Sequence, residues 1–329
     1  MKALIIGNQE RYEKFCPDTD FSRKVKKVYA ALDTPVEEIL RLGADASFLA
    51  ADAIAKVPGE VIRSMPDLRI IQSEGVAFNG IDCQAAAERG IYVCNNKGIN
   101  AAAVAEQAIF LMLGLLRSGR AGDRAVREGN QIRMKEQKML EGITELGDCT
   151  VGLIGFGDIG RAVARCLLPF GCRLVYYTPS RKPEEIEKAY RISWMEPGEM
   201  AETCDIISLH VPVTPATEKM IDGPFLKRMK PTAFLINTAR GEIVDNEALC
   251  RALEEGWIAG AGLDTVAPEP VPADHPLLQL SGAAEDRILF SPHLGGITTS
   301  TFRRAHRNIW QAFEDVAQGK RPANIVNGI

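Results

Sequence analysis

The segment of residues 151–161 has the residue types and spacing of a dinucleotide-binding loop. It reads VGLIGFGDIGR and places Gly155, Gly157 and Gly160 in G-x-G-x-x-G spacing between a predicted strand and a predicted helix. Gly155 allows a tight turn, Gly157 lets the backbone approach a pyrophosphate, and Gly160 lets the helix pack closely on the strand. The helix N-terminus adds amides and positive potential. Because the spacing alone also occurs in ordinary turns, the prediction depends on this strand–glycine–helix context.

The turn after the next predicted strand favours a 2′-phosphate on the adenosine ribose. An NAD site usually places Asp or Glu at this position. Here the chain reads Thr178-Pro179-Ser180-Arg181-Lys182, and the first acid is Glu184. Hydroxyls and two cations suit a phosphate, because a guanidinium can pair with it and no carboxylate repels it. The sequence therefore favours NADP over NAD, and the alternative interpretation is a solvated basic turn.

Three polar residues follow predicted strands elsewhere in the chain. Arg240 comes directly after residues 233–237, His293 lies between a proline and paired glycines after residues 288–290, and Glu269 lies in a proline-rich segment. Parallel α/β sheets bind ligands at the carboxyl ends of their strands. An arginine there can hold a carboxylate with two hydrogen bonds, and a histidine beside a carboxylate can move a proton. Taken singly, each residue also has an interpretation without function: Arg240 as a surface residue, His293 as a structural histidine and Glu269 as a solvated loop acid.

The elements that position these residues form a repeating pattern of short apolar runs and amphipathic helices. Such alternation predicts parallel sheets covered on both faces. Strands are expected at residues 3–6, 46–49, 70–73, 92–94, 150–154, 174–177, 206–210, 233–237, 259–263 and 288–290. Helices are expected, among others, at residues 35–42, 81–88, 161–170, 246–255 and 301–318. Since the alternation occurs twice, we predict two Rossmann-like, doubly wound α/β domains.

A helix-forming segment at residues 101–116 separates the two sets of strands. It is apolar nearly all round, which predicts a buried helix linking the two domains. The last helical pattern, residues 301–318, is too near the chain end to begin a third domain and is expected to pack on the first. The expected domains are therefore residues 1–100 with 297–329, and residues 101–296.

Composition narrows the class of protein. The 329 residues exceed what one hydrophobic core usually serves, and the net charge of -4 argues against a nucleic-acid or anionic-membrane partner. No stretch approaches the roughly 18 apolar residues of a membrane span. The eight cysteines form no CxxC or Cys/His pattern, which argues against structural zinc. These features indicate a reduced, cytoplasmic enzyme without a metal.

Taken in order, the motifs resemble the D-isomer-specific 2-hydroxyacid dehydrogenase family. The matching segments are residues 73–76 (SEGV), 79–82 (NGID), Asn100, 104–106 (VAE), the glycine fingerprint, 210–217 (HVPVTPAT), 237–241 (NTARG), Asp264, 269–270 (EP) and 292–296 (PHLGG). The turn at residues 177–182 (YTPSRK) is most similar to the glyoxylate/hydroxypyruvate reductase branch, in which NADP is often preferred.

The resemblance implies two Rossmann-like domains with a cleft between them, the substrate domain being built from both chain ends. It also implies a homodimer, with the region of the long helix contributing to the interface. The expected activity is hydride transfer between NAD(P)H and C2 of a small 2-keto or 2-hydroxy acid. Glyoxylate, hydroxypyruvate or a polyhydroxylated acid would be the substrate.

The family pattern also assigns roles to single residues. Arg240 would anchor the substrate carboxylate and keto oxygen, His293 would be the acid/base, and Glu269 would orient and charge it. Backbone amides near Gly75 and Val76 would help to hold the carboxylate. The resemblance places in the coenzyme site Gly155, Gly157, Asp158, Ile159, Gly160, Thr178, Ser180, Arg181, Val211, Pro212, Thr217, Thr238, Ala239, Asp264 and Gly295.

Glu74 departs from many relatives, which carry basic or neutral side chains in the substrate-facing loop. If Glu74 points inward, it should disfavour phosphorylated or dicarboxylic substrates and could bind substrate hydroxyls; the alternative is that it faces solvent. The other histidines fit the chemistry less well. His275 is expected to be structural, His306 lies on the terminal helix, and His210 matches a cofactor-side segment.

Two other functions compete with this interpretation. The same fold could act on formate or phosphite, as related dehydrogenases do. Alternatively, the chain could be a non-catalytic scaffold that senses nicotinamide and binds a partner. A docking extension or long disordered tails would favour the scaffold, whereas the complete set of Arg240, Glu269 and His293 favours an enzyme.

Overall fold

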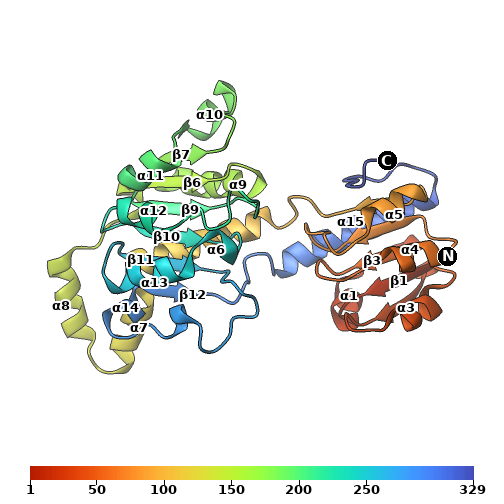
Figure 1. The fold of residues 1–329 in the computed structure, drawn as a ribbon, viewed down its shortest axis with the longest axis horizontal. Coiled ribbons are helices and arrows are strands. Elements are labelled where there is room, and N and C mark those ends of the chain that lie inside the picture. Colours follow the sequence, from red (N-terminus) through yellow and green to blue (C-terminus); the bar gives the residue numbers. More distant parts are fainter. The chain divides into compact units, whose positions relative to one another are not determined.

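The computed structural model describes all 329 residues, which form two compact units (Figure 1). Unit 1 comprises Met1–Ile99 and Thr298–Ile329, and unit 2 comprises Asn100–Ile297. Unit 2 is therefore inserted into the sequence of unit 1.

Unit 1 contains a five-stranded parallel sheet in the order β2-β1-β3-β4-β5. The strands are β1 (Lys2–Ile6), β2 (Lys26–Ala30), β3 (Phe48–Ala51), β4 (Ile70–Ser73) and β5 (Tyr92–Cys94). Apolar residues of α3 (Val36–Gly43), α4 (Gly59–Ser64) and α5 (Cys83–Glu88) form one core with the sheet. Those of α1 (Gln9–Phe15), α2 (Asp20–Lys24) and α15 (Thr299–Ala317) form a second. The strand order reverses between β1 and β3, where such sheets bind ligands at their carboxyl ends.

Unit 2 contains a seven-stranded parallel sheet in the order β12-β11-β10-β9-β6-β7-β8. The strands are β6 (Thr150–Ile154), β7 (Arg173–Tyr177), β8 (Ile192–Trp194), β9 (Ile206–Leu209), β10 (Phe234–Asn237), β11 (Gly260–Leu263) and β12 (Ile288–Phe290). The helices α6 (Ala101–Leu116), α9 (Asp158–Leu167) and α10 (Glu184–Tyr190) share one core with the sheet. The helices α11 (Pro197–Thr203), α12 (Gly223–Arg228) and α13 (Asn246–Glu254) share the other, and α14 spans Ala283–Asp286. The strand order reverses between β6 and β9.

Two helices of unit 2, α7 (Gly119–Arg127) and α8 (Gln131–Glu141), project from the body around its sheet (Figure 1). Neither has a buried residue. The preceding helix α6 has the predicted bounds and is mostly buried, which confirms the predicted helix and its burial. No single helix is long and apolar enough to cross a membrane; α6 and α7 meet that criterion only as a pair bent by 57°.

The predicted doubly wound α/β architecture is confirmed, and the sequence missed two strands, β2 and β8. Each lies at an edge of its sheet. The first two residues of β2 are Lys26 and Lys27, which weaken the apolar signal but suit an edge strand. Helix starts also differ: α9 begins at Asp158 rather than Arg161. The helix α5 begins at Cys83 because the Asp82 side chain accepts a hydrogen bond from the Ala85 amide and so caps it.

Candidate active site

The loop between β6 and α9 is shaped by its glycines. Gly155 has a φ of +102°, and a Cβ there would lie 2.2 Å from the carbonyl oxygen of His210. A Cβ on Gly160 would lie 2.2 Å from the carbonyl oxygen of Gly155, so α9 packs tightly on the turn. At Gly157 no atom lies within 4 Å of such a Cβ, which leaves open space at the start of the ten-residue helix α9. This loop fits the diphosphate of a dinucleotide.

Unpartnered polar atoms are buried at the carboxyl edge of the same sheet. They are Nδ1 of His210 after β9, Oγ1 of Thr238 after β10, and Oγ1 of Thr265 after β11. Burial lowers the pKa of His210 to about 3, so this imidazole is neutral. Its Nε2 lies 2.9 Å from the hydroxyl of Ser208. Because buried polar atoms rarely lack partners, their position at this edge supports a ligand with hydrogen-bonding groups.

The turn after β7 is tied to Glu187, a carboxylate on the following helix α10, and the sequence did not indicate this contact. Arg181 donates from Nε and Nη2 to the carboxylate of Glu187, at 2.9 and 2.7 Å. The Tyr176 hydroxyl donates to the same carboxylate and accepts from the Lys182 amide. The hydrogen bonds from Arg181 lower the pKa of Glu187 and keep it ionised. Arg181 is therefore paired already, and Lys182 is the turn's remaining cation.

Arg240 lies just beyond β10 in a loop held by Asn237. The Asn237 side-chain amide donates to the carbonyl of Arg240 at 2.8 Å, and its oxygen accepts from the Ala239 amide at 3.0 Å. A Cβ on Gly241 would lie 2.1 Å from the amide nitrogen of Ala267, so this loop packs against the segment that leads to Glu269. The Arg240 guanidinium is exposed and donates only to the Ala239 carbonyl. Its charge is not neutralised by any carboxylate.

His293 and Glu269 form a hydrogen-bonded pair. Nδ1 of His293 lies 2.8 and 3.0 Å from the two carboxylate oxygens of Glu269. The side chains are 39% and 53% exposed, and Nε2 of His293 has no protein partner. His293 has a φ of +55°, in the left-handed region, and its amide donates to the carbonyl of Asp264 at 2.9 Å. The pair therefore presents one free ring nitrogen.

Asp264 fixes the loop that carries His293. Its buried carboxylate accepts hydrogen bonds from the Ser291 hydroxyl at 2.5 Å, the Leu294 amide at 2.9 Å and the Gly295 amide at 2.8 Å. Ser291 in turn accepts from the side-chain amide of Gln107 at 2.8 Å. All the donors to this carboxylate lie in the loop on either side of His293. Asp264 therefore holds this loop in place, a role that the sequence did not indicate.

In unit 1, the segment of residues 74–77 presents amides rather than carbonyls. Its four carbonyl oxygens all accept hydrogen bonds from neighbouring groups. The donors are the Asn96 side chain to Glu74 at 2.9 Å, the Asn96 amide to Gly75 at 2.8 Å, the Asn95 side chain to Val76 at 2.7 Å and the Ser73 hydroxyl to Ala77 at 2.6 Å. The amides of Val76 and Ala77 have no protein partner. Such a loop suits an anion.

Comparison with known proteins identifies the family. The model of the D-isomer specific 2-hydroxyacid dehydrogenase NAD binding domain matches residues 109–295. The chain belongs to this family. It is an NAD(P)-dependent oxidoreductase that transfers a hydride at C2 of a 2-hydroxy or 2-keto acid. The predicted family and activity are thus confirmed.

Individual relatives agree over most of their length. The glyoxylate reductase of Korarchaeum cryptofilum is 38% identical over 82% of this chain and 80% of its own. The glyoxylate reductase of Thermofilum pendens is 36% identical over 88% of this chain and 84% of its own. The NAD complex of a D-isomer specific 2-hydroxyacid dehydrogenase from Lactobacillus delbrueckii is 26% identical, with a TM-score of 0.82 and coverage of 99% of this chain and 100% of that one.

Glu74 of this dehydrogenase is 5% exposed, so the alternative in which it faces solvent is wrong. Its carboxylate accepts from Nε and Nη2 of Arg11 at 3.1 and 2.6 Å, and lies 2.8 Å from Nε2 of His306. Both oxygens are thus occupied within unit 1. These partners lie far from Glu74 along the chain, so no local sequence pattern predicts them.

The remaining predicted coenzyme residues of the dehydrogenase lie in unit 2. Asp158 and Ile159 begin α9, and Val211 and Pro212 follow β9. Thr217 closes the next loop by donating to the Pro212 carbonyl at 2.6 Å. The Thr178 hydroxyl donates to the carbonyl of Ser180 at 2.7 Å, and Ala239 lies beside Arg240.

His275 is buried and structural, as predicted. Its Nε2 lies 3.1 Å from the carbonyl oxygen of Ala267 and 3.2 Å from the side-chain amide nitrogen of Asn246. Its Nδ1 accepts from the Leu277 amide at 3.3 Å. These contacts support the segment that carries Glu269.

Proposed function

We propose that this dehydrogenase reduces glyoxylate, hydroxypyruvate or a similar small 2-keto acid, with Arg240, Glu269 and His293 as its catalytic residues. One observation carries the proposal: His293 pairs with Glu269 through Nδ1 and keeps Nε2 free, while Arg240 remains an unpaired cation in the adjoining loop. The curated glyoxylate reductases among the relatives support the choice of substrate.

The chemistry follows from these atoms. When bound, the dihydronicotinamide supplies the hydride that reaches C2. His293 donates a proton from Nε2 to the keto oxygen as that oxygen becomes an alkoxide. Glu269 holds Nδ1 of His293 and so fixes the ring with Nε2 as the nitrogen that transfers the proton. Arg240 binds the substrate carboxylate and stabilises the developing oxyanion.

Unit 1 supplies further donors to the substrate carboxylate. We assign this role to the amides of Val76 and Ala77. The carbonyls of residues 74–77 are all engaged elsewhere, so the segment offers donors and no acceptors to an incoming anion. Gly75 allows a close approach, because a Cβ there would lie 2.6 Å from that of Ala53.

The coenzyme preference is assigned to NADP. The turn after β7 places no acid where an NAD site usually holds the ribose, and it carries Thr178, Ser180, Arg181 and Lys182. The pairing of Arg181 with Glu187 reduces the net charge of the turn but holds the guanidinium in a fixed place. The ratio of kcat/KM with NADPH to that with NADH tests the assignment directly, and a strong preference for NADH contradicts it.

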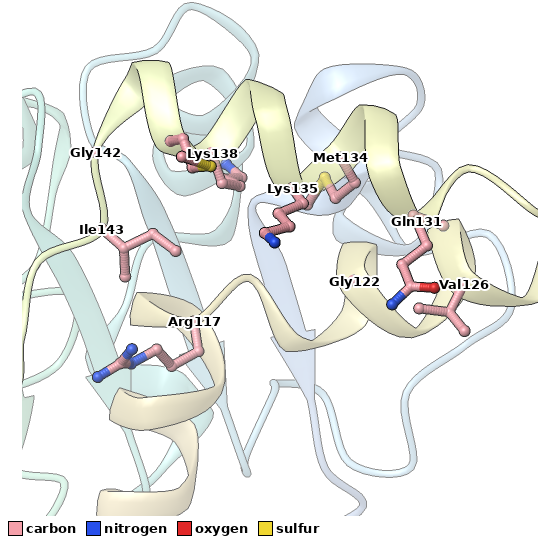
Figure 2. Close-up of a pocket in the computed structure, with 11 residues that line it drawn as sticks. Arg117, Gly122, Val126, Gln131, Met134, Lys135, Lys138, Gly142 and Ile143 are labelled. Atoms are coloured by element: carbon pink, nitrogen blue, oxygen red, sulfur yellow. The ribbon is translucent and has the colours of Figure 1, made fainter.

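A second copy of the chain would cover the helices α7 and α8, making the enzyme a homodimer. Their exposed side chains include Val126, Ile132, Met139 and Leu140, which are 58%, 62%, 74% and 90% exposed. Figure 2 shows the hollow between the two helices, lined by apolar side chains such as Met134 and Ile143. Exposed large apolar side chains gathered on two neighbouring helices support an interaction surface there. Sedimentation should give the dimer mass, and the Leu140→Glu variant should sediment as a monomer.

We also assign the enzyme to the cytoplasm. All eight cysteines are free thiols, including the buried Cys94, Cys149 and Cys204. Free thiols in this number fit a reducing compartment.

A spectrophotometric screen tests the proposed activity. Glyoxylate, hydroxypyruvate and larger 2-keto acids are offered with NADPH and with NADH, and aldonates, formate and phosphite with the oxidised coenzymes. The proposal expects oxidation of the reduced coenzyme with the smallest 2-keto acids. Turnover of formate or phosphite alone would contradict it, and no turnover of any compound would favour the scaffold.

A further inference from the structure

Arg11, Asp52, Glu74 and His306 form a charged cluster within unit 1, called here the Arg11 cluster. Nη2 of Arg11 contacts the carboxylates of both Asp52 and Glu74, and Nε of Arg11 donates to Glu74 at 3.1 Å. Nε2 of His306 lies 2.8 Å from Oε1 of Glu74, the oxygen that also accepts from Nε of Arg11. The Arg11, Asp52, Glu74 and His306 side chains are 26%, 13%, 6% and 0% exposed. Glu74 and His306 are therefore the buried centre of the cluster.

The cluster joins three adjacent strands of the sheet at their carboxyl ends. Asp52 directly follows β3, Glu74 directly follows β4, and Arg11 lies in α1, the helix after β1. The strands β1, β3 and β4 are neighbours in the sheet. His306 reaches the same point from α15. The four side chains thus meet at the edge where a parallel sheet binds ligands, beside the segment of residues 74–77.

Burial of this cluster is costly, so packing stability alone is a weak reason for it. Replacing a buried ion pair by apolar residues of similar volume is often neutral or stabilising. Two further polar atoms here lack partners altogether, namely Nδ1 of His306 and the hydroxyl of Tyr12. The site therefore holds several buried polar groups whose net contribution to stability is small. A role in placing the backbone of residues 74–77 accounts for them.

We propose that the Arg11 cluster is a positioning device that fixes residues 74–77 so that the Val76 and Ala77 amides remain free for the substrate carboxylate. This inference rests on the proposed function. The Glu74 side chain is anchored inward by Arg11 and His306, while Asn95 and Asn96 hold the carbonyls of the same segment. With the side chain and the carbonyls both fixed, the amides have no internal acceptor to turn toward.

The proposal differs from direct recognition of the substrate by Glu74. The Glu74 carboxylate already accepts from Arg11 through both oxygens and contacts His306, so its acceptor capacity is largely used inside the cluster. If Glu74 has a positioning role, its replacement raises KM by the same factor for every substrate that carries a carboxylate next to the keto group. A direct contact with a substrate hydroxyl raises KM for hydroxypyruvate and leaves glyoxylate unaffected.

The experiment compares Glu74→Ala and Glu74→Gln with the matched control Glu38→Gln. Glu38 pairs with Arg41 on the exposed face of α3, in the same unit. Amide hydrogen exchange of the peptide covering residues 73–81 is measured on each dimeric, coenzyme-free enzyme. KM and kcat are then measured with glyoxylate and hydroxypyruvate, and the dissociation constant of NADPH is measured by fluorescence.

For Glu74→Ala we expect exchange of the protected amides of this segment, those of Glu74 and Gly75, to accelerate about tenfold or more, because the loop loses three side-chain hydrogen bonds that had held it. KM should rise about tenfold for both acids alike, with kcat changed by less than about threefold and NADPH binding unchanged. Glu74→Gln keeps one side-chain oxygen as an acceptor but turns an N–H group toward a donor of Arg11 or His306, so it should change exchange and KM in the same direction as Glu74→Ala, by about threefold or more. The control should match the wild type.

Unchanged exchange in a folded Glu74→Ala enzyme would overturn the proposal, and so would a KM increase confined to hydroxypyruvate. If Glu74→Ala does not fold, Glu74→Gln and Arg11→Lys replace it. Both variants must then accelerate hydrogen exchange at residues 74–77. Unchanged exchange in the two variants refutes the proposal. If the wild-type enzyme reduces neither acid, the proposed function has failed, whereas the exchange measurement still decides the positioning role.

Discussion

The two units each contain a histidine paired with a glutamate, and the two pairs have the same contact distance. His293 lies 2.8 Å from Glu269, and His306 lies 2.8 Å from Glu74. The surroundings are opposite. The first pair is 39% and 53% exposed in a loop beyond a strand, and the second is 0% and 6% exposed between a helix and a strand end. In the first pair Nε2 of the histidine is free at the surface, whereas in the second the remaining Nδ1 is buried without a partner.

This difference teaches that a histidine–carboxylate contact does not by itself identify a proton donor. A general acid needs a ring nitrogen that a substrate can reach. The backbone of His293 provides this access, since its left-handed φ and the hydrogen bonds around Asp264 turn the ring toward the loop of Glu269. The ring of His306 is enclosed and contacts Tyr12 and Phe15, with centroids 4.7 and 5.8 Å away. Its effect must pass through Glu74.

The largest effect should come from removing the accessible histidine. His293→Ala should lower kcat about a thousandfold, because general acid catalysis contributes roughly 10²- to 10⁴-fold, while NADPH binding stays unchanged. The corresponding change in the buried pair, His306→Gln, should act mainly on KM. Steady-state kinetics on both variants check this, and a fall in kcat of equal size for the two would abolish the distinction between the pairs.

Arg240→Gln should have the next largest effect, on capture of the substrate rather than on proton transfer. Loss of a charged, two-point contact with the carboxylate should lower kcat/KM by about 10²- to 10³-fold, corresponding to roughly 3 to 4 kcal/mol. The amides of Val76 and Ala77, which we propose as further donors to the carboxylate, are unchanged in this variant, so we expect binding to be weakened and not abolished. Titration with an unreactive 2-keto acid analogue measures it, and unaltered affinity would remove Arg240 from the site.

Asp264→Asn should show how far the accessible pair depends on its loop. The new amide would place N–H groups against the Ser291, Leu294 or Gly295 donors, which now all point at a carboxylate. One unsatisfied buried donor costs about 1 to 3 kcal/mol, so we expect kcat to fall about 10- to 100-fold as the His293 loop loosens. Hydrogen exchange at residues 291–296 should accelerate. Wild-type kinetics would mean that the loop is held by other contacts.

A third histidine, His210, is buried without a carboxylate partner. Its replacement should have the smallest of these effects, and the effect should be on the pH dependence of stability. The pKa of His210 is lowered by burial to about 3, below its ordinary value near 6.5. The folded enzyme thus favours the neutral ring. The contribution of His210 to the free energy of unfolding is at its maximum above about pH 6.5. It falls as the pH decreases toward 3, by up to about 1.4 kcal/mol per pH unit. Urea unfolding measures the free energy of unfolding at several pH values between 7 and 4. For His210→Gln this free energy should fall less steeply with decreasing pH than for the wild type. Equal slopes would contradict the lowered pKa.

Position relative to predicted strands singled out two of the three polar residues of the candidate site. His293 and Arg240 directly follow apolar runs, and parallel sheets bring such positions to one edge. The glycine spacing likewise predicted where α9 would pack on its turn. Strand β8 was missed because it is a three-residue edge strand with little apolar pattern of its own.

The buried pair could not be predicted in the same way. Glu74 contacts Arg11 and His306, which are 63 and 232 residues away in sequence. No spacing rule relates residues so far apart, and only the packing of α1 and α15 on the same sheet brings them together. The pairing of Arg181 with Glu187 was missed for a different reason: the acid lies on the following helix rather than at the strand end where an acid was sought.

The insertion of one unit into the other imposes an order on biosynthesis. One face of the unit 1 sheet is closed by α15, where Trp310 and Phe313 pack with Phe21 and Phe48. During translation this helix is made after all of unit 2. The segment that begins the chain therefore cannot complete its fold until the final thirty or so residues arrive, and the inserted unit is the first to mature. A nascent chain stalled so that unit 2 has emerged from the ribosome but α15 has not should hold a protease-resistant coenzyme-binding unit attached to a protease-sensitive N-terminal segment.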